Sequence, residues 1–345
     1  TGINVVNYQM PFVLTGGTVI VWVQNSAFRN NNGASIFTLN GASSPAQLSF
    51  TAFSNIWQSN QVSLPNFSNG GGCINIWCDN ACNQSVTLYF NQFLNNLHFA
   101  AGGVLAMAGQ NATNQALLVS GNTWVGNQAN DGGCIYLNGP AGGSQAITVD
   151  GETVVNNAAH NNGGFLNLNG SSPMLDLELY RSNFTSNTAT ENGGVLFFAG
   201  NNSLAFYVSN CTVYQSVAKM GGVFYAATFT SAQIILTFSN FSQNNATADM
   251  GGILAVYIAN GTSPSSLKVV NCTLTGNQAV SGGGFGLNAT DITQLTISLT
   301  NNTVTTGYAT SNGSLLSIYQ SLTSGYLIGT LLVTNNSFQN ALAND

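Results

Sequence analysis

Short apolar runs return about every thirty residues along this chain of 345 residues. One run follows a glycine pair in most units, as in VLAM at 104–107, CIYL at 134–137 and VLFF at 195–198. These four-residue runs are too short and too rich in strand-forming residues for helices. We therefore expect a strand after each glycine pair, with Leu105 and Met107 as typical inward positions.

Two further strands are expected in each unit. One has an apolar residue at every second position, as in Val86 and Leu88 or Ile147 and Val149. Asn, Ser or Gly then ends the run before a short strand with a single apolar residue. This apolar column consists of Phe28, Trp57, Phe93, Trp124, Val154, Phe184, Val213, Phe241, Leu274, Val304 and Phe338. Three strands and three turns are expected to complete a unit.

Asparagine stands three residues after the apolar column in most units. These asparagines are Asn31, Asn60, Asn96, Asn127, Asn157, Asn187, Asn244 and Asn277. Asparagine tolerates left-handed backbone angles, and stacked asparagines share side-chain hydrogen bonds. We therefore predict a structural ladder of asparagines.

Repeated strands favour a parallel stack, in which each strand lies over its counterpart at ~4.8 Å. The predicted fold is all-β, a right-handed single-stranded parallel β-helix (a solenoid) of about eleven rungs of about 30 residues. Residues 1–345 form one repeat domain, since no change in composition marks a linker. Such a rod is roughly 50 Å long.

The pairing of F-x-x-N with G-G-[AVIL]-[ILVF] resembles the repeat of the chlamydial polymorphic outer-membrane proteins and related β-helical surface proteins. Phe93, Asn96 and GGVL at 102–105 carry both half-motifs, and so do Phe184, Asn187 and GGVL at 193–196. This resemblance extends over the whole chain. It implies a surface-exposed β-helix used in adhesion or in building an extracellular structure.

Charge is scarce, with 4 basic and 10 acidic residues. Binding of nucleic acid is not expected, because it requires a cationic surface. No apolar run is long enough for a transmembrane helix, and no signal peptide is visible at Thr1. We expect no membrane insertion and no cofactor, and an extracellular or cell-surface location.

Fifteen N-x-S/T sequons support a secreted glycoprotein. Five of them, at Asn183, Asn210, Asn240, Asn271 and Asn301, are assigned to a possible inward ladder. The favoured N-glycosylation sites are Asn66, Asn83, Asn111, Asn169, Asn201, Asn245, Asn260, Asn288 and Asn312. Several of the favoured sites, such as Asn169 and Asn288, are expected in the turn after the glycine-led strand.

Cys78 and Cys82 bracket one short loop and are the expected disulfide. The other four cysteines form two pairs, each two rungs apart and beyond the reach of a disulfide, so we expect buried thiols. They are Cys73, Cys134, Cys211 and Cys272. His98 and His160 lie in separate loops, so no metal site is expected.

One acidic cluster is the candidate for polysaccharide cleavage, a reaction of paired carboxylates. It consists of Asp150, Glu152, Asp176, Glu178 and Arg181. The register places Arg181 over Gly151, which suits a surface ion pair, and no motif of pectin-cleaving enzymes is visible. We therefore expect that the protein is not an enzyme.

Neither end reads as a cap. TGINVVNYQ at the start aligns with a glycine-led strand, and the chain stops just after Phe338. The predicted ends are in register, so the protein is expected to bind itself head to tail as the subunit of an extracellular filament. The alternatives are a segment of a β-helical surface adhesin and a polysaccharide-cleaving β-helix enzyme.

Overall fold

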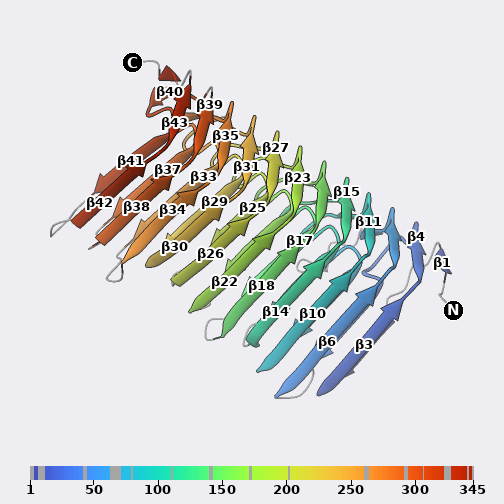
Figure 1. Cartoon of the computed structure of the whole chain (residues 1–345). Coiled ribbons are helices and arrows are strands. Elements are labelled where there is room, and N and C mark those ends of the chain that lie inside the picture. Colours follow the sequence, from blue (N-terminus) through green and yellow to red (C-terminus); the bar gives the residue numbers. More distant parts are fainter. Residues whose placement is uncertain are drawn as a thin grey trace.

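The computed structural model describes residues 4–6, 12–41, 45–62, 71–78, 81–109, 112–139, 143–170, 173–200, 203–259, 264–290, 294–305, 307–321, 328–339 and 342–343. In Figure 1 the strands stack along one axis, from the N-terminus to the C-terminus. All described strand pairs are parallel and join corresponding strands of successive repeats, as in β13 (Leu105–Gly109) with β17 (Ile135–Gly139). The predicted all-β solenoid is confirmed.

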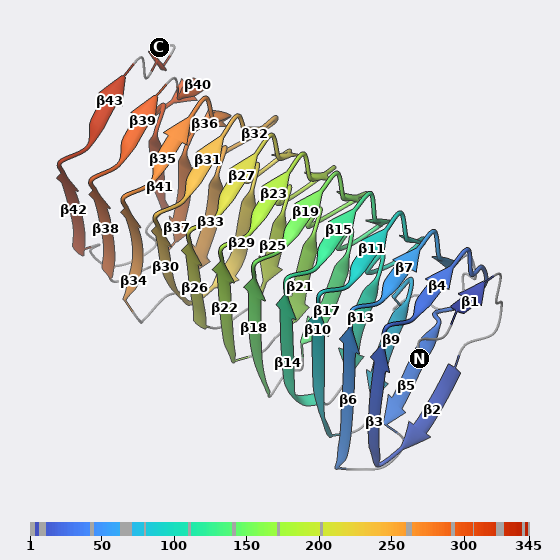
Figure 2. The same ribbon diagram turned by 45° about the vertical axis from the view of Figure 1, so that its right-hand side comes forward.

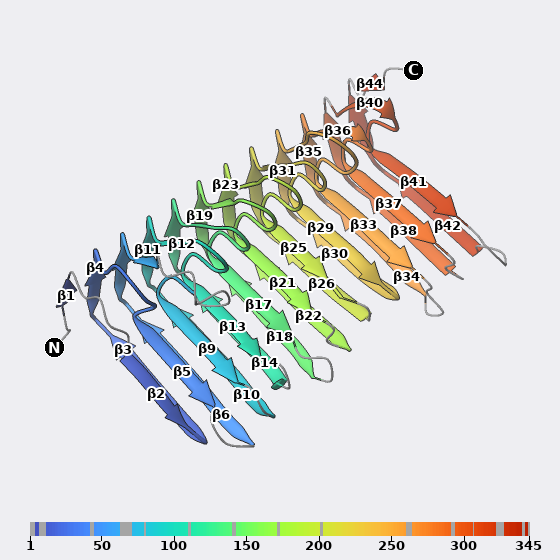
Figure 3. The ribbon, with the colours of Figure 1, turned by 180° about the vertical axis from the view of Figure 1, so that it is seen from behind.

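The glycine-led sheet contains the strands that follow the glycine pairs. Its 11 strands are β2 (Phe12–Gly16), β5 (Phe37–Gly41), β9 (Ile74–Cys78), β13, β17, β21 (Leu166–Gly170), β25 (Leu196–Ala199), β29 (Phe224–Phe229), β33 (Leu254–Ala259), β37 (Phe285–Thr290) and β41 (Leu316–Ser321). Figure 3 shows the rod from behind, with this sheet along its length. The expected inward residues Leu105 and Met107 are fully buried.

The long sheet contains the next strand of each repeat. Its 11 strands are β3 (Thr18–Gln24), β6 (Ala46–Phe53), β10 (Cys82–Tyr89), β14 (Ala112–Ser120), β18 (Ser144–Asp150), β22 (Met174–Tyr180), β26 (Ser203–Ser209), β30 (Ser231–Thr237), β34 (Ser265–Val270), β38 (Gln294–Thr300) and β42 (Ile328–Thr334). Val86 and Leu88 are buried as predicted, because alternate side chains point into the rod.

The aromatic sheet carries the apolar column. Its 12 strands are β1 (Asn4–Val6), β4 (Ala27–Arg29), β7 (Ile56–Gln58), β11 (Gln92–Leu94), β15 (Thr123–Val125), β19 (Thr153–Val155), β23 (Asn183–Thr185), β27 (Thr212–Tyr214), β31 (Asn240–Ser242), β35 (Thr273–Thr275), β39 (Thr303–Thr305) and β43 (Ser337–Gln339). Rings stack along the rod, with centroids 4.2 Å apart for Phe93 and Trp124.

A fourth sheet was not predicted. This short sheet contains β8 (Gln61–Val62), β12 (Leu97–His98), β16 (Gln128–Ala129), β20 (Ala158–Ala159), β24 (Thr188–Ala189), β28 (Val217–Ala218), β32 (Asn245–Ala246), β36 (Gln278–Ser281), β40 (Tyr308–Asn312) and β44 (Leu342–Ala343). Every repeat after the first described one therefore has a fourth strand, and the labels β32, β36 and β40 mark three of these strands in Figure 2. The prediction of three strands missed these pairs because two residues show no periodicity.

The glycine pairs have two separate steric causes. Gly102 has a φ of +64°, a left-handed conformation that a side chain strains. Gly103 needs space instead, because a Cβ there would lie 2.2 Å from the carbonyl oxygen of Gly133 in the next rung. The first glycine thus turns the chain, and the second lets successive rungs approach each other.

The predicted phase of the chain start is wrong. Val5 pairs with Phe28, so β1 belongs to the aromatic sheet and not to the glycine-led sheet. The first glycine-led strand is β2, in which Phe12 pairs with Phe37. The described part of the chain begins with the aromatic-sheet strand β1, and its last rung contains the aromatic-sheet strand β43, followed by β44 of the short sheet. The two ends therefore overlap by one aromatic-sheet strand.

Candidate functional site

The predicted asparagines line one buried corner, between the aromatic and short sheets. Asn127 is typical: its Oδ1 accepts from the backbone N and the Nδ2 of Asn96, at 3.0 and 2.9 Å. Its Nδ2 donates to Asn157 Oδ1 and to the carbonyl of Phe93, both at 2.9 Å. All eight predicted asparagines are buried. We call this row the regular ladder.

The regular ladder is interrupted at Ser216. Its backbone N donates to Asn244 Oδ1 at 2.9 Å, as an asparagine there would. Its Oγ is buried and has no hydrogen-bond partner among the described residues. The side chain is too short to continue the row of amides.

A second buried row, which sequence reasoning missed, lines the corner between the long and aromatic sheets. In this mixed ladder the asparagine, glutamate and serine side chains after Ser26 accept from the backbone N of their predecessors, as Asn122 does from Asn91 at 2.8 Å. The positions are Ser26, Asn55, Asn91, Asn122, Glu152, Ser182, Cys211, Ser239, Cys272, Asn302 and Asn336. The available signal was a non-aliphatic residue two places before every member of the apolar column.

Glu152 is the only ionisable carboxyl group among these ladder positions, and it is 1% exposed. Its Oε1 accepts from the backbone N and the Nδ2 of Asn122, at 3.1 and 3.0 Å. Its Oε2 accepts from Trp124 Nε1. Burial raises the pKa of Glu152 to about 8, although the hydrogen bonds from Trp124 and Asn122 act in the opposite direction.

The candidate acidic cluster does not come together as a catalytic pair. Glu152 points into the rod, whereas Asp176 is exposed on the outer side of the long sheet and Glu178 is half-buried there. Arg181 forms the predicted surface ion pair with Asp150, with Nε–Oδ1 and Nη2–Oδ2 distances of 2.9 and 2.5 Å. An exposed pair of this kind contributes little to stability.

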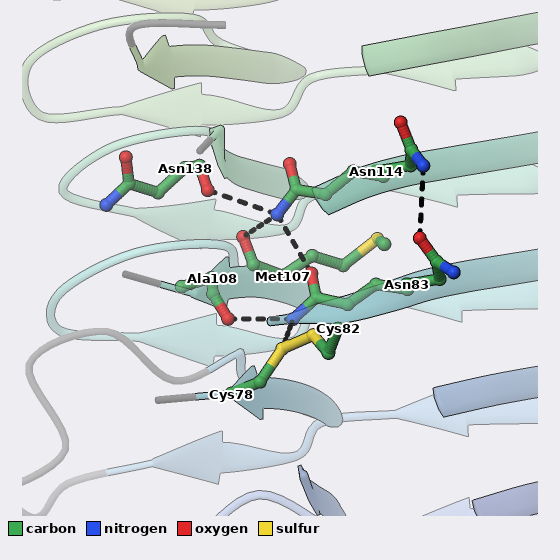
Figure 4. The surroundings of a disulfide bond; sticks show 9 residues. Cys78, Cys82, Asn83, Met107, Ala108, Asn114 and Asn138 are labelled. Atoms are coloured by element: carbon green, nitrogen blue, oxygen red, sulfur yellow. Dashed lines mark hydrogen bonds between the residues drawn. A yellow bond between two sulfur atoms is a disulfide. The ribbon is translucent and has the colours of Figure 1, made fainter. Parts of the chain in front are cut away.

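Cys78 and Cys82 form the predicted disulfide, with their Cα atoms 6.5 Å apart. Next to it lies a third buried row, formed by glutamines. Gln84 Nε2 contacts Cys78 Sγ at 2.9 Å and donates to the Ala108 carbonyl at 2.8 Å. Figure 4 shows this region beside the outer pair Asn83 and Asn114. Gln115 and Gln145 extend the row, each donating to the preceding glutamine at 2.8 Å.

The other four cysteines are free and buried, as predicted. Burial raises the pKa of Cys211 and of Cys272 to about 11, and it raises the thiol pKa of Cys73 and Cys134 further. These thiols are therefore protonated and unreactive at neutral pH.

His98 and His160 line the same surface groove beside the short sheet. His98 is buried, and its Nδ1 accepts from the backbone N of Ala100 and Ala101 at 3.0 and 2.9 Å. Burial lowers the pKa of His98 to about 4. No group of three or more metal-ligating side chains occurs in the described ranges.

Five of the nine favoured glycosylation sites can be placed. Asn83, Asn169 and Asn312 are exposed, whereas Asn245 and Asn288 are half-buried. Asn169 and Asn288 lie within β21 and β37 and not in the turn that was expected. Asn66, Asn111, Asn201 and Asn260 lie outside the described residues.

Both ends of the described rod expose side chains that are buried in other rungs. At the C-terminal end, Phe338 is 49% exposed, whereas its partner Val304 in the preceding rung is 2% exposed. At the N-terminal end, Leu14 is 39% exposed and its partner Leu39 is fully buried. Each end thus presents an apolar surface together with strand edges.

The described part of the chain contains no helix that could span a bilayer. Comparisons with family models, with curated proteins and with solved structures found no match for this chain.

Proposed function

We propose that this protein is an extracellular structural rod whose copies associate end to end into a filament. The observation that carries the proposal is the half-exposed core at both ends of the described rod. A second copy would bury these side chains, and burial of apolar surface favours association by ~25 cal/mol per Å². The disulfide between Cys78 and Cys82 supports an oxidising location.

Strand edges give this association a direction. β2 and β3 are the first strands of the glycine-led and long sheets, and β41 and β42 are the last. An edge strand binds a further strand through its unpaired backbone groups. In a head-to-tail contact, β41 and β42 of one copy would pair with β2 and β3 of the next, continuing both sheets in parallel.

The overlap of the ends imposes one condition on this contact. If β41 and β42 of the first copy pair directly with β2 and β3 of the second, then β43 of the first copy and β1 of the second would occupy the same position beside β4 of the second copy. β1 has only three residues and one described neighbour, β4. We therefore expect β1 to leave its place when copies associate.

Electron microscopy of the purified protein tests the proposal. The expected result is fibres that are many times longer than one rod of ~50 Å. Val333→Lys would place a charge at the inward side of the C-terminal edge and should abolish fibres. Leu332→Lys, on the outward side of the same strand, is the matched control and should leave them intact. Deleting residues 1–10 should preserve or accelerate assembly.

Single rods at all protein concentrations would overturn the filament proposal. Equal loss of fibres in both lysine variants would also count against end-to-end pairing. Monomeric rods that bind a surface receptor would instead identify the adhesin alternative.

A further inference from the structure

The five sequon asparagines predicted for an inward ladder are on the surface instead. Asn183, Asn210, Asn240, Asn271 and Asn301 are all exposed. The inward positions of this corner are the neighbouring residues of the mixed ladder, such as Ser182 and Cys211. The predicted inward positions are therefore wrong by one residue. In a strand, a shift of one residue moves a side chain from the inner to the outer face of the sheet.

Together with Asn335, these residues form a row on one edge, where the long sheet turns into the aromatic sheet. Each of the last six aromatic-sheet strands, from β23 to β43, has one sequon at this edge. The first asparagine of the row is Asn183 and the last is Asn335. We call this row the sequon edge.

Backbone geometry alone does not account for the sequon edge. The corner residue has a positive φ in every rung, as in Asn210 (54°) and Asn271 (54°), and asparagine tolerates this conformation. Two corners, however, hold Arg181 (48°) and Phe238 (48°). In those two rungs the sequon asparagine lies two residues later, on the strand itself, so the sequon is kept although its position changes.

The first half of the same edge contains no sequon. Its corners are Asn25, Ser54, Phe90, Gly121 and Gly151, all with positive φ. Thr123 and Thr153 stand two residues after the two glycines, where they would complete a sequon if the corner were asparagine. The corner residues therefore have positive φ in both halves of the rod, but sequons occur at this edge in only one half.

We infer that the sequon edge, which runs from Asn183 to Asn335 in the C-terminal half of the rod, is an N-glycosylated face. The donor class is an oligosaccharide linked to a polyprenyl pyrophosphate. A bond forms between the asparagine Nδ2 and the anomeric carbon, the bond from that carbon to the pyrophosphate oxygen breaks, and Nδ2 loses one proton. The inference rests on the proposed function only in requiring an extracellular protein.

Spacing limits how many sites are occupied at once. Successive rungs are ~4.8 Å apart, which is less than the width of a sugar ring with its hydroxyl groups. Asn183 and Asn240 lie two residues after the corner residues of their rungs, whereas the other four asparagines are the corner residues themselves. The six sites therefore do not form one straight line. We expect partial occupancy, with neighbouring sites excluding each other.

Mass spectrometry of glycopeptides from the native protein, and from the full chain secreted by eukaryotic cells, tests the inference. Sugar is expected on at least three of the six asparagines in both. Thr212→Val should remove the glycan of Asn210, whereas Thr212→Ser should retain it, because serine completes the sequon. Gly151→Asn should add a glycan at the same edge in the sequon-free half.

Unmodified asparagines along the sequon edge, with glycans at Asn83 or Asn169, would overturn the inference. A native protein without any glycan would overturn it as well. Electron microscopy of the same samples separates the two proposals, because fibres formed by sugar-free protein would leave the proposed function standing. Glycosylated rods that never associate would refute the filament proposal and support glycosylation of the sequon edge.

Discussion

The regular and mixed ladders do the same work at two corners with different residues. At most positions of both, a side-chain oxygen accepts a backbone N–H from the preceding rung, as Asn157 does from Asn127 and Glu152 does from Asn122. In the regular ladder the asparagine Nδ2 also donates to the following rung. Serine, cysteine and glutamate in the mixed ladder supply only part of this pattern. Both corners thus favour an acceptor, and repetition of the amide adds side-chain hydrogen bonds along the rod.

The largest effect should follow from breaking the regular ladder. Asn127→Leu leaves the N–H groups of Asn96 and the carbonyl of Phe93 buried without these partners. Each unpaired buried group costs about 1–3 kcal/mol. We expect the free energy of unfolding to fall by about 4 kcal/mol in urea titrations.

The exposed Asn183 provides the control for this variant. Asn183→Leu should change the free energy of unfolding by less than about 0.5 kcal/mol. Equal losses in the two variants would show that the ladder bonds contribute no special stability.

The mixed ladder should give stability a dependence on pH. The folded pKa of Glu152, about 8, lies above the ordinary value of 4.5. The folded state therefore binds the proton more tightly, and stability is lost as the pH rises from 4.5 to 8. At ~1.4 kcal/mol per pKa unit, the loss by pH 7 is on the order of 3 kcal/mol.

Unfolding of the wild type and of Glu152→Gln at several pH values would measure this loss. In this variant the amide N–H group lies against a hydrogen-bond donor, either Trp124 or Asn122. The resulting change in the free energy of unfolding is the same at every pH, because glutamine does not titrate. Only the wild type should carry the pH-dependent part assigned to Glu152. His98 acts oppositely in both proteins, since its folded pKa of about 4 makes stability rise up to pH 6.5. Parallel pH profiles would refute the role of Glu152.

The smallest effect should come from repairing the regular ladder. Ser216→Asn would supply an acceptor for Asn187 and a donor for Asn244, as in the neighbouring rungs. One or two added buried hydrogen bonds should stabilise the protein by about 1 kcal/mol. A lower melting temperature for this variant would mean that the corner at Ser216 has no room for an amide.

The regular ladder could be predicted because one residue type recurs with the period of the repeat. Asn96 and Asn127 belong to a visible column, whereas Asn122, Glu152 and Ser182 share only an acceptor atom. The disulfide was equally accessible, since Cys78 and Cys82 are close in sequence. The row from Gln84 to Gln145 covers three rungs, too few for a sequence period.

The fold was predicted where side chains alternate, and it was missed where strands are too short to alternate. β20 has two residues, Ala158 and Ala159, and pairs through its backbone with β16 and β24. The phase of the first strand failed for a different reason. Gly2 resembles the glycine columns, yet the pairing of Val5 with Phe28 follows the apolar column instead.

The amides of the regular ladder all point the same way. In each of the five links from Asn31 to Asn187, the Nδ2 of one asparagine donates to the Oδ1 of the asparagine in the next rung toward the C-terminus. Aligned dipoles add, as they do for peptide groups along a helix. The row therefore gives the rod an axial dipole, with its positive pole toward the C-terminus. Rods placed in line attract when unlike poles meet, so a fibre of these subunits would itself be polar.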